Sequence, residues 1–369
     1  MTNQRFATDH RLYLADARKL SFVTSDSIDL IVTSPPYPMI EMWDESFCNQ
    51  APTIRISLEN NAPENAYELM HALLDDAWDA CFRVLRPGGF ACINIGDATR
   101  TFDSNFRLFT NHARIVTACE RSGFTSLPPI VWRKTTNAPN KFMGSGMYPA
   151  GAYVTLEHEY ILVFRKPGKR SFATGDDQDR RRRSAFFWEE RNAWFSDLWN
   201  VPGVRQSQLD RKQSSNRSRS SAEKRRGAAV LPGASRTRSG AFPFEIALRL
   251  VLMHSIEGDT VLDPFTGTGT TQMAALATGR NSVGSDLAPD LIEQARNVLL
   301  SAQDAGNDYL EARLEAHRQF EAATRKAGNT LRYQNAHYGF SVKTLQERTI
   351  LLRPVTAIEE VGDLIVARY

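Results

Sequence analysis

Two short segments of the sequence hold residue types that could do chemistry. The first, TSPPY at residues 33–37, directly follows a largely apolar run at residues 28–32 that is typical of a buried strand. Because proline lacks a backbone N–H and has a fixed φ, the two prolines must end that strand. The strand therefore ends in a rigid turn carrying a hydroxyl group and an aromatic ring. Taken alone, such a turn fits a binding loop or a rigid connection equally well.

The second segment, DPFTGTGTT at residues 263–271, lies where a predicted strand passes into a predicted helix. In doubly wound α/β sheets, ligands bind at this position, and glycine lets the backbone approach them closely. The segment lacks both the GxGxxG pattern of dinucleotide sites and the lysine of a P-loop. Asp263 would also repel a phosphate group. We therefore expect a cation or an amine here, such as the methionyl ammonium of S-adenosylmethionine.

An acidic residue, Asp286, ends the next predicted strand, about 20 residues after the glycine-rich turn. A carboxylate at that position can accept hydrogen bonds from the two hydroxyls of a ribose. The combination of strand, glycine-rich turn, helix and second acid favours a nucleoside cofactor over a purely structural turn.

The elements that must position these segments alternate along the chain. Residues 10–166 show predicted strands at 27–34, 88–98 and 157–166, separated by predicted helices at 64–85 and 111–123. The alternation returns at residue 242 and continues to about residue 300. It indicates a doubly wound, mostly parallel α/β sheet.

The stretch between these two regions is basic and irregular. Residues 165–240 contain nineteen Lys and Arg against eight Asp and Glu, and since the whole chain has a net charge of +3, the flanks carry −8. A polyanionic partner would explain this pattern, and so would a solvated, partly flexible loop. We expect four parts: a catalytic half (1–165), a basic insert (166–240), a cofactor-binding half (241–305) and a C-terminal helical cap with an appendage (306–369).

Together, the two motifs resemble those of the DNA amino-methyltransferases, specifically the group that methylates N4 of cytosine. In that family the catalytic motif is TSPP followed by Tyr or Phe, and the cofactor motif is DPFxGxGTT. The catalytic motif comes first here, which resembles the permuted β arrangement of the family. Further matching segments are RVLRPGGF (83–90), INIGD (93–97), HEYILVFRK (158–166) and FPFEIALRLV (242–251). The resemblance covers roughly residues 10–300.

This resemblance implies a Rossmann-like methyltransferase domain that uses S-adenosyl-L-methionine and acts on a base flipped out of double-stranded DNA. Ser34 Oγ and the Pro35 carbonyl would accept hydrogen bonds from the target amine, while Pro35 and Pro36 keep the turn rigid. Tyr37 would stack on the flipped ring. The residues that would contact the cofactor are Asp16, Phe244, Asp263, Phe265, Gly267, Gly269, Thr270 and Asp286.

The basic insert occupies the place of the target-recognition region in the family. The residues expected to contact DNA phosphates are Arg180, Arg181, Arg182, Arg183, Arg211, Lys212, Arg217, Arg219, Lys224, Arg225 and Arg226. A cognate restriction endonuclease is expected as a genetic partner of such an enzyme.

Three alternatives to cytosine-N4 methylation are considered. Adenine-N6 methyltransferases usually carry Asp or Asn where this chain has Ser34, so we rank that activity second. Cytosine-C5 methylation is discarded, because it needs a nucleophilic cysteine after proline and the four cysteines here follow Ala or Phe. A DNA-binding protein with an inactive methyltransferase fold is the least favoured, because both motifs are intact.

The remaining features of the sequence point to a cytoplasmic protein. No run approaches the ~18 apolar residues of a transmembrane helix. The N-terminus lacks the apolar segment of a secretory signal. The cysteines (Cys48, Cys81, Cys92, Cys119) form no CxxC pair, so we expect reduced thiols and neither disulfides nor a metal site.

Overall fold

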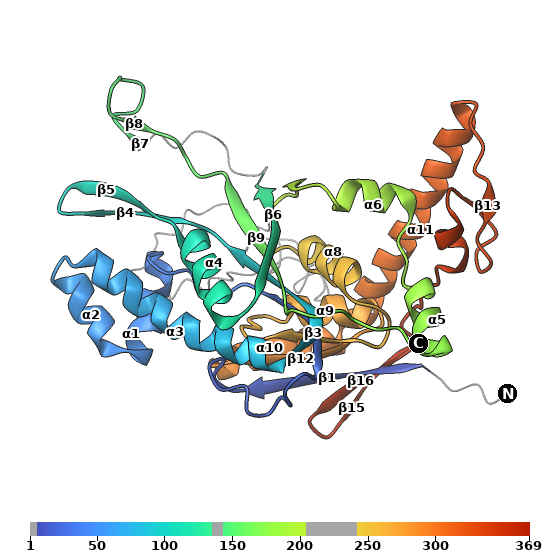
Figure 1. Cartoon of the computed structure of the whole chain (residues 1–369), viewed down its shortest axis with the longest axis horizontal. Helices are drawn as coiled ribbons and strands as arrows, with labels where there is room; N and C mark the ends of the chain where they lie inside the picture. The colour runs from blue at the N-terminus through green and yellow to red at the C-terminus, as the bar shows by residue number, and fades with distance from the viewer. Residues whose placement is uncertain (1–5, 135–142, 204–241) are drawn as a thin grey trace, which may run out of the picture.

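The computed structural model describes residues 6–134, 143–203 and 242–369, which are built around one ten-stranded sheet (Figure 1). Its strands lie in the order β10-β6-β9-β3-β2-β11-β12-β1-β16-β15. Neighbouring strands from β3 to β1 are parallel, whereas β9 and β16 are each antiparallel to both of their neighbours. The mostly parallel α/β sheet predicted from the sequence is confirmed.

The strands of this sheet are β1 (Ala7–Leu14), β2 (Ile28–Thr33), β3 (Leu85–Ile95), β6 (Thr125–Arg133), β9 (His158–Arg165), β10 (Leu198–Asn200), β11 (Thr260–Asp263), β12 (Asn281–Asp286), β15 (Ala357–Val361) and β16 (Leu364–Arg368). Three small hairpins are formed by β4 (Ala98–Phe102) with β5 (Asn105–Phe109), β7 (Met143–Gly144) with β8 (Ala152–Tyr153), and β13 (Tyr333–Gln334) with β14 (Ser341–Val342). The α-helices are α1 (Asp44–Gln50), α2 (Pro52–Glu59), α3 (Pro63–Val84), α4 (Asn111–Ser122), α5 (Gly175–Arg183), α6 (Trp188–Trp194), α8 (Phe244–His254), α9 (Thr270–Ala277), α10 (Pro289–Leu300) and α11 (Ala302–Lys326), with short 3₁₀ turns at Glu41–Trp43 and Leu345–Thr349.

The central strand β2 is buried on both faces, as its apolar run predicts. Ile31 packs into one hydrophobic cluster with residues of α3 and α4. Its neighbours Leu30 and Val32 point the other way, into a cluster built from α8 and α9. Helices therefore cover both faces of the sheet around β2, which is the doubly wound arrangement. None of the helices in the described residues is long and apolar enough to span a membrane.

The direction of the strands gives the sheet two chemically different edges. Strands β1, β2, β3, β11 and β12 all end along one of them, which we call the carboxyl edge. The TSPPY turn follows β2 there, and the DPFTGTGTT turn follows β11. Because β9 is antiparallel, it begins at this edge instead of ending there. The opposite side, where the parallel strands begin, is the amino edge.

The C-terminal residues are integrated into the sheet. Strands β15 and β16 extend it beyond β1, and α11 is the helix that the sequence predicts near residues 308–327. Further along, Arg353 pairs with Glu257 at the amino edge, at 3.1 Å. Residues 306–369 are therefore more closely joined to the domain than an appendage would be. The four-part division of the chain stays a prediction.

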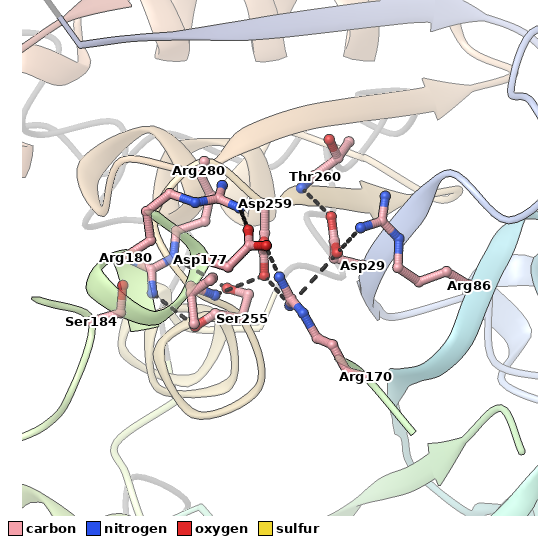
Figure 2. Close-up of polar contacts among 12 residues, drawn as sticks. Asp29, Arg86, Arg170, Asp177, Arg180, Ser184, Ser255, Asp259, Thr260 and Arg280 are labelled. Carbon is pink, nitrogen blue, oxygen red and sulfur yellow. Dashed lines mark hydrogen bonds and ion pairs between the residues drawn. The ribbon is translucent and has the colours of Figure 1, made fainter. Parts of the chain in front are cut away.

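The amino edge carries a buried network of charges (Figure 2). Asp29 and Asp259 are both almost fully buried, and the guanidinium of Arg170 lies between them. Arg86 also pairs with Asp29, at 2.7 Å. Burial and the charge of Asp259 raise the pKa of Asp29 to about 6. Two acids this close are tolerable only because arginines neutralise them.

Replacing Arg170 with alanine should therefore destabilise the protein strongly. Asp259 would lose its direct ion pair while remaining buried, which typically costs about 3–5 kcal/mol. The measurement is urea unfolding followed by circular dichroism at pH 7.5. Arg182→Ala is the matched control, because Arg182 is 62% exposed and pairs with Asp179 across one helical turn. We expect the control to change the free energy of unfolding by less than about 0.5 kcal/mol. Equal effects of the two variants would contradict the role given to Arg170.

Candidate active site

The two motifs predicted from the sequence meet directly at the carboxyl edge. Thr33 Oγ1 donates a hydrogen bond of 2.6 Å to Asp263 Oδ1, although the two residues are 230 positions apart. Thr271, at the other end of the second motif, donates to the backbone carbonyl of Val32 at 3.2 Å. Both motifs are therefore parts of one site.

A cavity of about 540 Å³ opens between the two motifs. Its volume is in the range of pockets that hold small cofactors. Eight of the predicted site residues line it: Asp16, Ser34, Pro36, Asp263, Phe265, Gly267, Thr270 and Asp286. The remaining wall is mostly apolar and includes Trp43, Phe47, Leu73, Leu74, Phe242, Leu287 and Leu291. Polar groups thus gather on the motif side of the cavity, facing an apolar wall.

Asp263 is the most buried acid of the cavity, with 2% of its surface exposed. Burial raises the pKa of Asp263 to about 6, against the opposing effect of the Thr33 hydrogen bond. The backbone N–H of Phe265 also donates to its carboxylate, at 3.0 Å. A buried carboxylate with one firmly bonded oxygen can attract a positively charged group in the cavity.

Asp286 is held by the backbone. Its two carboxylate oxygens accept hydrogen bonds from the N–H groups of Gly267 and Ala288, each at 3.0 Å. The bond from Gly267 ties the glycine-rich turn to the end of β12. Burial raises the pKa of Asp286. Each carboxylate oxygen keeps a free lone pair, so two adjacent hydroxyls could still bind there.

The predicted adenine-side residue, Asp16, is paired with Arg18. The guanidinium makes several hydrogen bonds to the carboxylate, the shortest at 2.6 Å. Although burial opposes it, Arg18 holds the pKa of Asp16 below its usual value. Both residues line the cavity, where they form a polar rim beyond the end of β1.

Two predicted cofactor contacts are placed elsewhere. Gly269 has a φ of +86°, and a Cβ on it would lie 3.0 Å from the Ala295 Cβ, so the glycine serves the close packing of α9 against α10. The Phe244 ring packs edge-to-face on Tyr309, with ring centroids 5.7 Å apart, and does not line the cavity. Phe242, two residues earlier, lines it instead. The FPF pattern identifies this helix start but does not say which ring faces the ligand.

Tyr37 has a different environment from the predicted stacking face. Only 9% of the residue is exposed, and its ring lies against Gly96. Its hydroxyl donates to Glu159 Oε2 at 2.9 Å and lies 3.2 Å from Ser34 Oγ. Asn94 Nδ2 donates to the Tyr37 hydroxyl at 2.7 Å and to Glu159 at 2.8 Å. Tyr37 is thus a hydrogen-bonding centre behind Ser34, and the stacking role stays a prediction. Pro35 is buried in the same turn.

Asn94 and Glu159 were missed by the sequence predictions. Asn94 lies near the end of β3 in INIGD, and Glu159 near the start of β9 in HEYILVFRK. Both are polar side chains in otherwise apolar strands. That pattern is a usable signal, because a polar side chain in a buried strand needs a partner.

The predicted DNA contacts fall in two groups. Arg180, Arg181, Arg182 and Arg183 lie on α5 (Figure 1), which contacts Glu257 at the amino edge, and none of the four lines the cavity. Arg180 pairs with Asp177 and Arg183 with Glu257, so their charges are already compensated. This placement does not favour the predicted phosphate contacts of the four arginines. Arg211, Lys212, Arg217, Arg219, Lys224, Arg225 and Arg226 lie outside the described residues.

Comparison with known proteins agrees with this geometry. Residues 28–297 match the model of the N6/N4 DNA methylases. This chain belongs to that family. The matched region contains β2, both motifs and most of the cavity lining, whereas Asp16 and Arg18 precede it.

Several relatives resemble the chain over most of its length. The Type II methyltransferase M.MthZI of Methanothermobacter thermautotrophicus is 44% identical over 94% of this chain and 90% of its own. M.MjaI of Methanocaldococcus jannaschii is 44% identical over 77% of this chain and 89% of its own. A Thermus thermophilus protein solved in complex with S-adenosyl-L-methionine is 30% identical, with a TM-score of 0.56 over 78% of this chain and 92% of that one.

The affinity of this DNA methylase for S-adenosyl-L-methionine should depend on pH through Asp263. Below the raised pKa of about 6, the carboxyl group is protonated and cannot attract an ammonium group. We expect affinity to be constant above pH 7 and to fall by up to about tenfold per pH unit below 6. Isothermal titration calorimetry between pH 5 and 8 measures it. Asp263→Asn should bind weakly at every pH, and a variant with wild-type affinity would rule out the contact.

A pair of phenylalanine variants tests the wall of the cavity. Phe242→Ala removes part of the cavity wall. It should weaken cofactor binding by about tenfold, which corresponds to roughly half of the free energy of burying an aromatic side chain. Phe244→Ala is the matched control, because its ring packs on Tyr309. The control should lower the melting temperature while leaving the dissociation constant within about twofold. The reverse pattern would restore Phe244 as the cofactor contact.

Proposed function

We propose that this protein is a Type II DNA methyltransferase that transfers the methyl group of S-adenosyl-L-methionine to the exocyclic N4 of a cytosine flipped out of double-stranded DNA. The observation that carries the proposal is the single cavity lined by Ser34, Asp263 and Asp286. A serine hydroxyl that can accept a hydrogen bond from an amine therefore belongs to the same cavity as two acids that suit a cationic nucleoside. When bound, the cofactor supplies an electrophilic methyl group on a sulfonium.

The residues present fit that cofactor. Asp263 offers a buried negative charge for the methionyl ammonium, and Asp286 offers free lone pairs for the ribose hydroxyls. The apolar wall, which includes Leu287 and Leu291, suits a planar base. A site built for pyrophosphate would present backbone N–H groups and cations instead.

The catalytic turn would hold and orient the target amine. Ser34 Oγ lies at the cavity wall and can accept one N–H of the amine. The Pro35 carbonyl, which belongs to a rigid turn, can accept the other. Two fixed acceptors direct the nitrogen lone pair at the methyl group, and such preorganised positioning is the main catalytic device we invoke. No strong base is needed for the attack itself.

The choice of cytosine over adenine depends on Ser34. A serine at this position is typical of the cytosine-N4 group, whereas the adenine-N6 group usually carries Asp or Asn. Adenine-N6 methylation on the same fold is the second candidate. We further propose that the enzyme works in the cytoplasm and protects host DNA from a cognate restriction endonuclease.

The direct test is methyl transfer to unmethylated genomic DNA by the purified protein with labelled cofactor. We expect label in DNA, recovered as N4-methylcytosine when the nucleosides are separated by mass spectrometry. Recovery of N6-methyladenine alone would replace cytosine by adenine in the proposal, and no transfer at all would overturn the enzymatic function.

Ser34→Ala isolates the catalytic turn from the cofactor site. The variant keeps Asp263 and Asp286, so its cofactor dissociation constant should stay within about twofold of wild type. Its turnover should fall by at least about 10²-fold, because one of two amine acceptors is gone. Wild-type turnover in this variant would refute the role of the hydroxyl.

A further inference from the structure

Behind Ser34, four polar side chains form one continuous network. The Tyr37 hydroxyl contacts Ser34 Oγ, Glu159 Oε2 and Asn94 Nδ2, at 3.2, 2.9 and 2.7 Å. The other carboxylate oxygen of Glu159 accepts from the ammonium of Lys134. Neither the catalytic motif nor the cofactor motif contains Asn94, Lys134 or Glu159.

Counting hydrogens gives this network a direction. A phenol has one hydrogen and two lone pairs. The Tyr37 hydrogen goes to Glu159, because an ionised carboxylate can only accept. Tyr37 accepts from Asn94, whose Nδ2 can only donate. Its second lone pair remains for Ser34, so the Ser34 hydroxyl must be the donor in their contact.

This direction decides what Ser34 can offer to a substrate. Since its only hydrogen is turned toward Tyr37, its oxygen faces other groups as a pure acceptor. An acceptor suits an amine, which carries N–H groups, and disfavours a carbonyl oxygen at the same place. The network would therefore select aminated bases, cytosine or adenine, against bases with a carbonyl at that position.

We propose that Glu159 is a positioning residue which, acting through Tyr37, keeps the Ser34 hydroxyl oriented as an acceptor for the substrate amine and receives the proton that the methylated nitrogen releases. This inference rests on the proposed function and deepens it. Its test is designed so that the two can fail separately.

The neighbouring side chains hold the Glu159 carboxylate in place. Its side chain is 12% exposed, and Lys134, which follows β6, supplies the compensating charge. The Lys134 ammonium itself lies over the Trp132 ring, 4.9 Å from its centroid. From the side of β3, Asn94 donates to the carboxylate. Burial and the Glu159 charge raise the pKa of Tyr37 well above its usual value, so the phenol keeps its hydrogen.

The proton released by the methylated nitrogen can pass along the same network of side chains. Once the amine nitrogen carries the new methyl group, it is a cation. Its N–H bond breaks with the electron pair staying on nitrogen, and the proton passes to Ser34 Oγ. The original Ser34 hydrogen moves to the Tyr37 oxygen, and the Tyr37 hydrogen moves to Glu159. Both hydroxyls are regenerated, and Glu159 becomes a neutral acid that later releases the proton to solvent.

Other titratable groups near Glu159 can be separated from it. Lys134 and Tyr37 are the ones that contact its carboxylate. The neighbouring residue on β9, Tyr160, points to the other face of the strand and stacks on His112, which is paired with Asp97. Asp263 titrates in the cofactor cavity. The assay therefore uses saturating cofactor, so that weaker cofactor binding at low pH does not limit the measured rate.

The experiment measures single-turnover methyl transfer to unmethylated genomic DNA at saturating cofactor, from pH 5.5 to 9. If Glu159 takes up the released proton, replacing its carboxyl group should change the shape of the pH profile. Glu159→Gln should lower the rate by about 10- to 100-fold, because the amide carries no charge and takes up no proton. The pH profile of this variant should differ in shape from that of wild type, and its cofactor dissociation constant should match wild type.

Tyr37→Phe and the double variant test whether the two residues act through one path. Each single change should slow transfer to a similar degree, and the double variant should be no slower than the slower single variant. Glu157→Gln is the matched control, because Glu157 lies two residues away and pairs with Arg133 at the surface, at 3.4 Å. The control should keep the wild-type rate and pH profile.

The outcomes separate the inference from the proposed function. A wild-type enzyme that transfers no methyl group removes the proposed function, and the positioning role with it. An active wild type with an unchanged rate and pH profile in Glu159→Gln overturns the inference alone. Additive losses in the double variant also overturn it, because they would show that Tyr37 and Glu159 act independently.

Discussion

The hydrogen bond from Thr33 to Asp263 is the contact on which the arrangement of the site depends. A carboxylate as buried as Asp263 must have donors, and the nearest one is the last residue of β2. Satisfying that requirement brings together the end of β2 and the end of β11, two segments from opposite ends of the chain. The TSPPY turn and the glycine-rich turn then have to face the same cavity, since each continues directly from one of these two residues.

The parallel sheet extends this constraint to the other side chains. Strands that run in one direction end along one edge, so Asp286 and Asp16 arrive beside the cavity without any signal of their own beyond their place after a strand. The amino edge differs, because in the described residues it presents no acid to a cavity of this kind. Its acids, Asp29 and Asp259, are closed off by arginines, and the charges there hold elements together.

Much of this could be predicted from the sequence, and the differences between expectation and structure have physical causes. The sheet and the turns at the ends of its strands follow from periodicity, glycine and proline, and the resemblance to the DNA amino-methyltransferases implies that the two motifs form one site. Gly269 and Phe244 were assigned by motif position, but a glycine can serve helix packing as well as a ligand, and which of two nearby rings faces a cavity depends on tertiary packing. Glu159 was missed because its partner, Tyr37, is 122 positions away and no local pattern joins them.

The antiparallel course of β9 has one more consequence, which concerns the hairpin of β7 and β8. The hairpin of β7 and β8 projects from the connection between Lys134 and Glu159 (Figure 1). Both roots of that connection are tied together, by the ion pair and by a 2.8 Å bond from the Lys134 N–H to the Glu157 carbonyl. On the other side of the hairpin, residues 154–157 lead directly into β9, the strand that carries Glu159. A residue of the network behind Ser34 thus stands at the base of a segment that projects away from the sheet (Figure 1).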